Sequence, residues 1–161
     1  MSRTFIYGLL AVAGLTLVCF ILPNLAESQK TTQCSGTSEI LWNIANQEET
    51  YRKAEGRYAR DLNRLAAHPR TGRKEMLQSL AETGLKGGYR FGTLPAFNAS
   101  GESDPAKGFA YYAVPETYAV TGRRIYIMDQ TGIWYRDTGN ATPPAAWPSP
   151  NPVAAGWTLL E

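Results

Sequence analysis

The stretch RIYIMDQTGIWYR, residues 124–136, decides the fold class because two strand-like runs flank a turn. Both runs, Arg124–Met128 and Ile133–Arg136, are rich in β-branched and aromatic residues, which favour strands. The link between them, Asp129-Gln-Thr-Gly132, suits a hairpin, because Asp accepts hydrogen bonds from nearby backbone N–H groups and Gly can adopt a positive φ. The stretch therefore predicts an antiparallel β-hairpin.

Two further strands are predicted on the N-terminal side of the hairpin. They are Tyr89–Leu94 and Phe109–Val114, each followed at once by a proline, and residues 97–107 between them form a loop rich in Asn, Ser, Gly, Asp and Pro. After the hairpin, the chain is too rich in proline for regular structure to be expected. Its two tryptophans, Trp147 and Trp157, nevertheless indicate that this tail lies against the domain.

Apolar residues recur at helical spacing over residues 24–58. The polar residues that fall largely between them are Gln47, Glu48, Arg52 and Lys53. This pattern predicts an amphipathic helix whose polar face carries these four side chains. Gly56 is expected to end it, because glycine readily adopts the left-handed conformation that follows a helix.

Two shorter helices are expected before the sheet. Asp61 can cap one helical turn that runs to Leu65. Lys74–Thr83 reads as a second helix, with Thr71 as its N-cap and Gly84 as its C-terminal stop.

Together these elements predict an α+β fold, in which a long N-terminal helix packs on a small antiparallel sheet of about four strands. We divide the chain into an apolar half of the helix (1–23), an amphipathic half (24–58), a region of helical loops and sheet (59–139) and a proline-rich tail (140–161).

The N-terminal part contains an uncharged segment, TFIYGLLAVAGLTLVCFIL, residues 4–22. As a helix it would span roughly 28 Å, close to the hydrocarbon thickness of a bilayer. Arg3 precedes it, so the positive-inside rule predicts a single-pass anchor with the C-terminal domain outside the cytoplasm. A secretory signal peptide is the alternative, because Ala26-Glu-Ser28 has the small-x-small pattern of a cleavage site and would leave a mature start near Gln29.

Several motifs occur in a definite order along the chain. Leu22-Pro-Asn-Leu-Ala-Glu-Ser28 follows the apolar segment, Gly56-Arg-Tyr58 closes the amphipathic half, and the sheet region contains Gly88-Tyr-Arg-Phe91 and Gly108-Phe-Ala-Tyr111. The first two motifs resemble the N-terminal helix of type IV pilins and of type II secretion pseudopilins, and the later two resemble the sheet of bacterial pilin-like proteins of unassigned role. The resemblance implies a helix that packs among the helices of other subunits, where small residues allow close approach. The residues that it assigns to this packing are Phe5, Gly8, Leu9, Ala11, Gly14, Leu17, Ile21 and Pro23.

The N-terminal processing motif departs from the pattern of that family. Prepilins carry a glycine followed by an aromatic residue and, shortly afterwards, a glutamate within the apolar run. Here Gly8 is followed by Leu9, and no acidic residue precedes Glu27. The resemblance is therefore to a pilin-like subunit with a degenerate motif, which would join a filament without this glutamate.

Basic residues are concentrated between Arg52 and Arg90, where ten Lys/Arg against four Asp/Glu give a net charge of +6. Residues 1–51 and 91–161 each sum to −2, which accounts for the overall +2. Such a patch can contact a partner subunit, anionic lipid or nucleic acid. Nucleic acid is the least favoured, because the interleaved tyrosines have core-facing spacing. The candidate contact residues are Arg52, Lys53, Arg57, Arg60, Arg64, Arg70, Arg73 and Lys74.

The expected function is that of a non-catalytic pilin-like or pseudopilin-like subunit of a cell-envelope filament or secretion apparatus. We expect it in the bacterial cytoplasmic membrane or in a cell-surface filament, with other pilin-like subunits or assembly machinery as partners. Two alternatives stay open: a monomeric membrane-anchored binding or sensor domain outside the cytoplasm, and a secreted domain released by signal peptidase. The sequence contains no His/Cys cluster, phosphate-binding glycine loop or nucleophile elbow, so neither catalysis nor a cofactor or metal is predicted.

Overall fold

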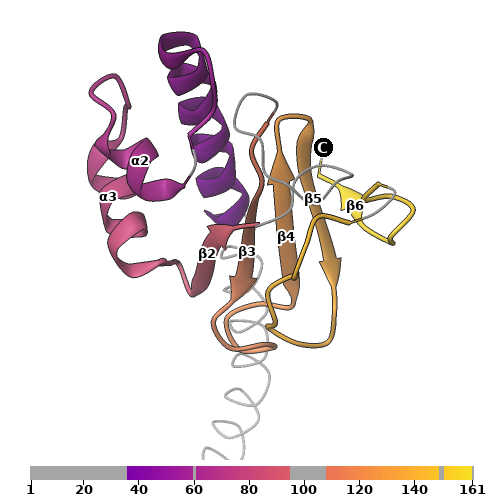
Figure 1. Cartoon of the computed structure of the whole chain (residues 1–161). Helices are drawn as coiled ribbons and strands as arrows, with labels where there is room; N and C mark the ends of the chain where they lie inside the picture. Colours follow the sequence, from indigo (N-terminus) through magenta and orange to yellow (C-terminus); the bar gives the residue numbers. More distant parts are fainter. Residues whose placement is uncertain (1–35, 60, 95–107, 149–150, 161) are drawn as a thin grey trace, which may run out of the picture. The chain divides into compact units, whose positions relative to one another are not determined.

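The computed structural model describes residues 36–59, 61–94, 108–148 and 151–160, and these residues form helices and an antiparallel sheet (Figure 1). These residues all belong to one of the two units into which the chain divides, Gln33–Glu161. The first described helix covers residues 36–55. The elements that follow are α2 (Leu62–Ala67), α3 (Lys74–Thr83), β1 (Leu85–Lys86), β2 (Tyr89–Thr93), β3 (Tyr111–Pro115), β4 (Arg124–Asp129), β5 (Gly132–Asp137) and β6 (Thr158–Leu159).

The strands form a single antiparallel sheet in the order β1-β2-β3-β4-β5-β6, so each strand pairs with its neighbours in the sequence. The α+β class is confirmed, and the predicted strands correspond to β2–β5. The predicted number of about four strands is wrong, because the sheet has six. The two additional strands, β1 and β6, contain only two residues each and show no alternation that a sequence pattern could reveal.

The turn between β1 and β2 explains why the first edge strand exists. Lys86 pairs with Tyr89, which leaves Gly87 and Gly88 as a two-residue loop. Both glycines have positive φ, 59° and 76°. This is the conformation of a type I′ turn, whose twist matches that of the strands it joins.

The central hairpin is confirmed, with one correction to its turn. Asp129 Oδ1 accepts hydrogen bonds from the Thr131 N–H at 2.7 Å and the Gly132 N–H at 3.2 Å, as predicted. Gly132 itself does not have a positive φ, because it already pairs with Asp129 in the ladder. A Cβ at Gly132 would lie 2.9 Å from Leu159 Cδ1, so the close approach of the tail, rather than the turn, accounts for this glycine.

The ends of the helices agree with the sequence at all but one predicted cap. Asp61 caps α2 by accepting a hydrogen bond from the Arg64 N–H at 2.9 Å, and Gly84 ends α3 with a φ of 66°. The predicted Thr71 cap of α3 is wrong, because the Thr71 hydroxyl donates to the Leu65 carbonyl instead, at 2.8 Å. The N-cap residue is Arg73, which has a φ of 50° and makes no side-chain cap bond.

The long helix ends at its predicted glycine. Its last helical residue is Glu55, and Gly56, with a φ of 71°, donates its N–H to the Arg52 carbonyl at 2.9 Å. The part of this prediction that covers residues 24–35 lies outside the described residues.

The sheet is packed on both faces. On one face the helices contribute Leu41, Ile44, Leu65 and Leu77 to a cluster with large sheet residues such as Tyr111. Figure 1 shows the helices together on one side of the sheet, with β6 at its far edge. On the second face lies a smaller cluster, whose members from the sheet and the tail are Leu94, Ala110, Val114, Ile125, Ile127, Trp134 and Trp157.

The tail lies against the domain, as its tryptophans predicted. Trp157 is buried, and Trp147 contacts the Trp134 ring edge-on with a centroid distance of 5.6 Å. The expectation that the tail has no regular structure is wrong, because Thr158 and Leu159 pair with β5. This pairing places Trp157 next to the sheet.

We expect Gly122→Ala to destabilise the fold by about 1–3 kcal/mol, because overpacking forces buried neighbours to move. A Cβ at Gly122 would overlap the hydroxyl and ring of Tyr89, which is fully buried. The matched control is Gly36→Ala, where nothing among the described residues lies within 4 Å of the new Cβ. Urea unfolding of both variants tests this prediction, and equal midpoints for the two would contradict it.

Candidate interaction surface

The predicted membrane-anchor residues, from Phe5 to Pro23, lie outside the described residues, as does Arg60 of the predicted basic patch. Among the residues that the structure does describe, no helix is both long and apolar enough to cross a membrane. The site that can be built from the described residues is therefore the basic patch.

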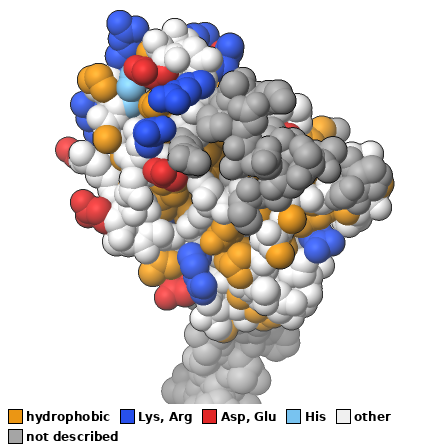
Figure 2. All heavy atoms as spheres, viewed as in Figure 1, with side chains coloured by type: hydrophobic (Ala, Val, Ile, Leu, Met, Phe, Trp, Pro, Cys, Tyr) orange, Lys and Arg blue, Asp and Glu red, His pale blue; other side chains and the backbone are white. Residues whose placement is uncertain are grey.

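The positive charge is confined to a shorter stretch than Arg52–Arg90. Residues 52–74 contain eight Lys/Arg and two Asp/Glu, which gives the whole +6. This stretch, here called the basic cap, consists of the end of the long helix, α2, the first residue of α3 and the loops between them. Figure 2 shows Lys and Arg side chains gathered over these helices. The described bases of the cap are all exposed: Arg52, Lys53, Arg57, Arg64, Arg70, Arg73 and Lys74.

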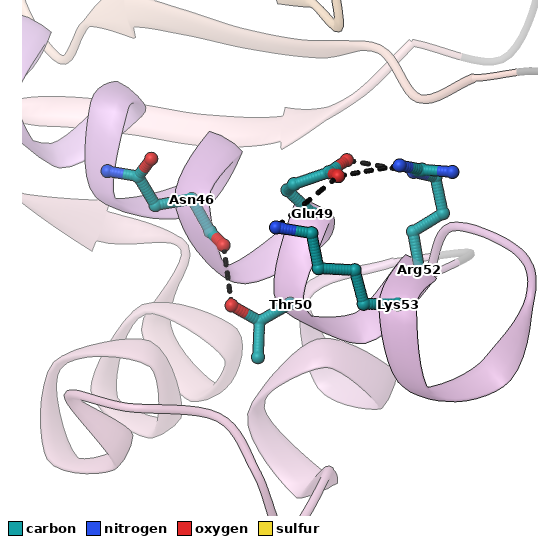
Figure 3. Close-up of polar contacts among 5 residues, drawn as sticks. All are labelled: Asn46, Glu49, Thr50, Arg52 and Lys53. Atoms are coloured by element: carbon teal, nitrogen blue, oxygen red, sulfur yellow. Dashed lines mark hydrogen bonds and ion pairs between the residues drawn. The ribbon is translucent and has the colours of Figure 1, made fainter.

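Two of these bases share one carboxylate on the long helix. Arg52 donates from Nε and Nη2 to the two oxygens of Glu49 at 2.8 and 2.6 Å, and Lys53 Nζ lies 3.9 Å from Glu49 Oε1 (Figure 3). In the same view the Thr50 hydroxyl donates to the Asn46 carbonyl. The hydrogen bond between Arg52 and Glu49 lowers the pKa of Glu49 and raises the pKa of Arg52. Because the pair is exposed, it adds little to stability.

The other bases of the cap that the structure describes have a weak ion pair or none. Arg73 Nη1 lies 4.0 Å from Glu39, which is the limit of an ion pair. Within the described part of the chain, Arg57, Arg64, Arg70 and Lys74 form no ion pair. The acids of the cap do not neutralise them either, because both are otherwise engaged.

Each acid of the cap has a structural partner. Glu55 Oε1 lies 3.2 Å from Nε2 of His68, a nearly buried side chain that also packs against the Tyr51 ring. Asp61 accepts the capping hydrogen bond at the start of α2. The positive charge of the cap is therefore available to a binding partner.

Two hydrogen bonds, one exposed and one buried, fix the loops of the cap to the long helix. Gln47 Oε1 accepts from the Gly72 N–H at 2.7 Å, and Glu48 Oε2 accepts from the Ala59 N–H at 2.8 Å. Both loops thus have side-chain attachments to consecutive residues of one helix. The backbone at Ala59 and at Gly72 is therefore held in position before any partner binds.

The position of Glu48 differs from the prediction. The amphipathic pattern predicts it on the polar face of the helix, but its side chain is fully buried. The Tyr111 hydroxyl donates to its Oε1 at 2.5 Å, so the carboxyl links the long helix to β3. Burial raises the pKa of Glu48 to about 7, although the hydrogen bonds from Tyr111 and Ala59 oppose this effect. No described cation pairs with it.

A sequence signal for this burial existed. Leu41, Ile44, Glu48 and Tyr51 are separated by three, four and three residues, which places all four on one side of a helix. The helical spacing therefore indicates that Glu48 is buried, whereas the charge of its side chain predicts that it is exposed.

The other acid that is buried within the described residues has a structural role. Asp129 accepts hydrogen bonds within its own turn, and burial raises its pKa. Over the described ranges, no three His, Cys, Asp or Glu side chains lie close enough together to hold a metal ion. The basic cap is thus the candidate site, and what it offers is a surface for binding anions.

Comparisons of the chain with protein-family models, with curated proteins and with solved structures gave no match.

Proposed function

We propose that this chain is a non-catalytic pilin-like subunit of a cell-envelope filament or secretion apparatus, anchored by its N-terminal helix. The observation that supports this best is the packing of the helix over residues 36–55 against one face of an antiparallel sheet, through Leu41, Ile44 and Tyr51. The motif Gly56-Arg-Tyr58, on which the resemblance to pilins partly rests, directly follows this helix.

In this proposal the two halves of the N-terminal helix have different roles. The uncharged residues 4–22 lie in the membrane or among the helices of neighbouring subunits, where Gly8 and Gly14 allow the backbones to approach. The amphipathic half carries the sheet and the cap outside the cytoplasm. Because no acidic residue precedes Glu27, apolar packing alone sets the register of the helices.

A monomeric membrane-anchored binding domain is the second candidate. The exposed and weakly compensated charge of the basic cap favours it, because a surface of this kind suits a soluble or membrane-attached partner as well as a neighbouring subunit.

The N-terminus and the oligomeric state of the native protein test these proposals together. We expect full-length protein from the membrane fraction to begin at or close to Met1 by intact mass, because the anchor is retained. Chemical cross-linking in the same membranes should yield oligomers, and Gly14→Leu should reduce them by separating the helices. The control is Val12→Leu, an apolar change outside the proposed packing residues.

The possible results separate the candidates. A mature start near Gln29 would contradict the anchor itself. A retained anchor with monomers only would favour the binding domain over the pilin-like subunit. If Val12→Leu reduces the cross-linked oligomers as much as Gly14→Leu does, the proposed packing residues are wrong.

A further inference from the structure

The chemistry of the basic cap indicates what kind of anion it binds. Arg57, Arg64 and Arg70 are exposed and have no ion pair among the described residues. A guanidinium is planar and presents its N–H donors as a fork, which matches the two oxygens of a carboxylate or the oxygens of a phosphate. The cap thus offers several separate points of bidentate recognition.

The cap is poorly suited to stacking against nucleobases. Its only tyrosine is Tyr58, and it contains neither Phe nor Trp. Tyr58 is half-buried, its ring packs edge-on against Phe109, and the Arg52 guanidinium lies 5.8 Å from the ring centroid. Proteins that bind single strands without sequence preference present exposed aromatic rings to the bases. A partner that carries carboxylates fits the cap better.

An apolar element lies next to the charged groups. A shallow hollow of about 480 Å³ is lined by Arg73, Lys74, Glu75 and Met76. With two cations against the one carboxylate of Glu75, the hollow keeps a net positive charge beside a thioether. It therefore suits a peptide that combines several acidic residues with an apolar one, because methionine adapts to irregular apolar surfaces. A polyphosphate backbone has no group that would use Met76.

We propose that the basic cap binds an acidic segment of a partner protein, whose carboxylates pair with the exposed arginines and whose apolar side chain sits beside Met76. The hydrogen bonds from Gly72 to Gln47 and from Ala59 to Glu48 hold the loops in place before binding, which reduces the entropy lost on association. This inference goes beyond the proposed function, and it stands or falls independently of the membrane anchor.

The test uses the full chain in detergent and a fluorescein-labelled EEELEEEL peptide as the probe, followed by fluorescence anisotropy. We expect binding that weakens as salt is added, because the contacts are ionic. The combined change Arg57→Gln, Arg64→Gln and Arg70→Gln should weaken it by about tenfold or more. The matched control removes three exposed charges outside the cap, by Lys86→Gln, Arg90→Gln and Arg123→Gln, and should leave affinity within about twofold.

Four unlabelled ligands and one further variant decide the class of partner. A QQQLQQQL peptide should not bind, and Met76→Gln should weaken the binding of EEELEEEL without changing its salt dependence. The proposal is overturned if the probe does not bind, if both triple variants lose affinity equally, or if a short duplex DNA or phosphatidylglycerol vesicles displace the probe at lower concentration than unlabelled peptide does.

Arg73→Gly separates binding from folding. Arg73 has a left-handed backbone, with a φ of 50°, that glycine adopts without strain. The variant should therefore be at least as stable as the parent to urea and yet bind the probe more weakly. If the variant bound the probe with unchanged affinity, Arg73 would not belong to the binding surface. The hollow beside Met76 would then have no role in binding.

Discussion

Raising the pH from about 5 to about 8 should lower the free energy of unfolding by about 2–3 kcal/mol through Glu48 alone. Burial raises the pKa of its carboxyl to about 7 in the folded protein, from 4.5 when it is exposed. The folded state therefore holds a proton that the unfolded state has already released. The stabilising contribution of Glu48 to the free energy of unfolding is fully present below pH 4.5 and is lost as the pH rises through about 7.

The cause is the neutral surroundings of this side chain. The two groups that donate to Glu48 are the Tyr111 hydroxyl and the Ala59 N–H, and neither brings a charge to offset the cost of burying a carboxylate. The nearby negative charge of Asp61 raises the pKa further. Burying Tyr111 next to this carboxyl also raises the pKa of its own hydroxyl well above the usual value.

Urea unfolding across this pH range, with Glu48→Gln beside the parent, measures the effect. Glutamine keeps the size of the side chain and carries no charge, so the stability of the variant should vary much less with pH. Asp129, whose pKa burial also raises, contributes in the same direction and remains in both proteins. If the free energy of unfolding of the parent and of the variant changed equally with pH, the pKa of Glu48 would be the same in the folded and unfolded states.

Tyr111→Phe is the complementary change. It removes the hydroxyl that donates to Glu48 and leaves the ring in the core. The pKa of Glu48 should rise further, because this hydrogen bond favours the charged form. The loss of stability should then be complete only at a higher pH than in the parent, which a titration of the unfolding midpoint would reveal.

The parts of the fold that the sequence predicted are those with a repeated or chemically specific local signal. The bounds of α3 follow from helical spacing and from Gly84, and β2–β5 follow from runs of aromatic and β-branched residues between turns. Thr71 shows the limit of such signals. Its hydroxyl can cap a helix, but the Leu65 carbonyl, six residues earlier, takes the hydrogen bond instead.

The features that the sequence did not predict depend on partners that are distant along the chain. Glu48 can be buried because Tyr111, 63 residues away, supplies a donor, and no local pattern contains that information. The basic cap likewise has some features that the sequence shows and others that only the structure shows. Its net charge can be counted from the sequence, but the attachment of Gly72 to Gln47 and the sharing of Glu49 by two bases require the structure.

Trp157→Ala should be the most destabilising single change, at about 3–5 kcal/mol, because it leaves a large cavity in a packed cluster. The side chain is only 4% exposed and packs with Trp134, Ile125 and Ile127 on the second face of the sheet. The Arg136 guanidinium also lies 4.6 Å from the centre of the Trp157 ring. Removal of the indole would therefore expose apolar sheet residues and deprive a cation of its aromatic partner.

The matched control is Trp42→Ala, which removes the same indole from the outer surface of the long helix. Trp42 is 49% exposed, so its loss should change stability by no more than about 1 kcal/mol. Thermal and urea unfolding of the two variants compare the tail with the surface directly. Trp157 is held by a turn in which its own N–H donates to the Pro152 carbonyl at 3.0 Å, and β6 follows at once. If the two alanine variants were equally stable, the proline-rich tail would be an appendage of the domain; a large difference makes it the layer that closes the second face of the sheet.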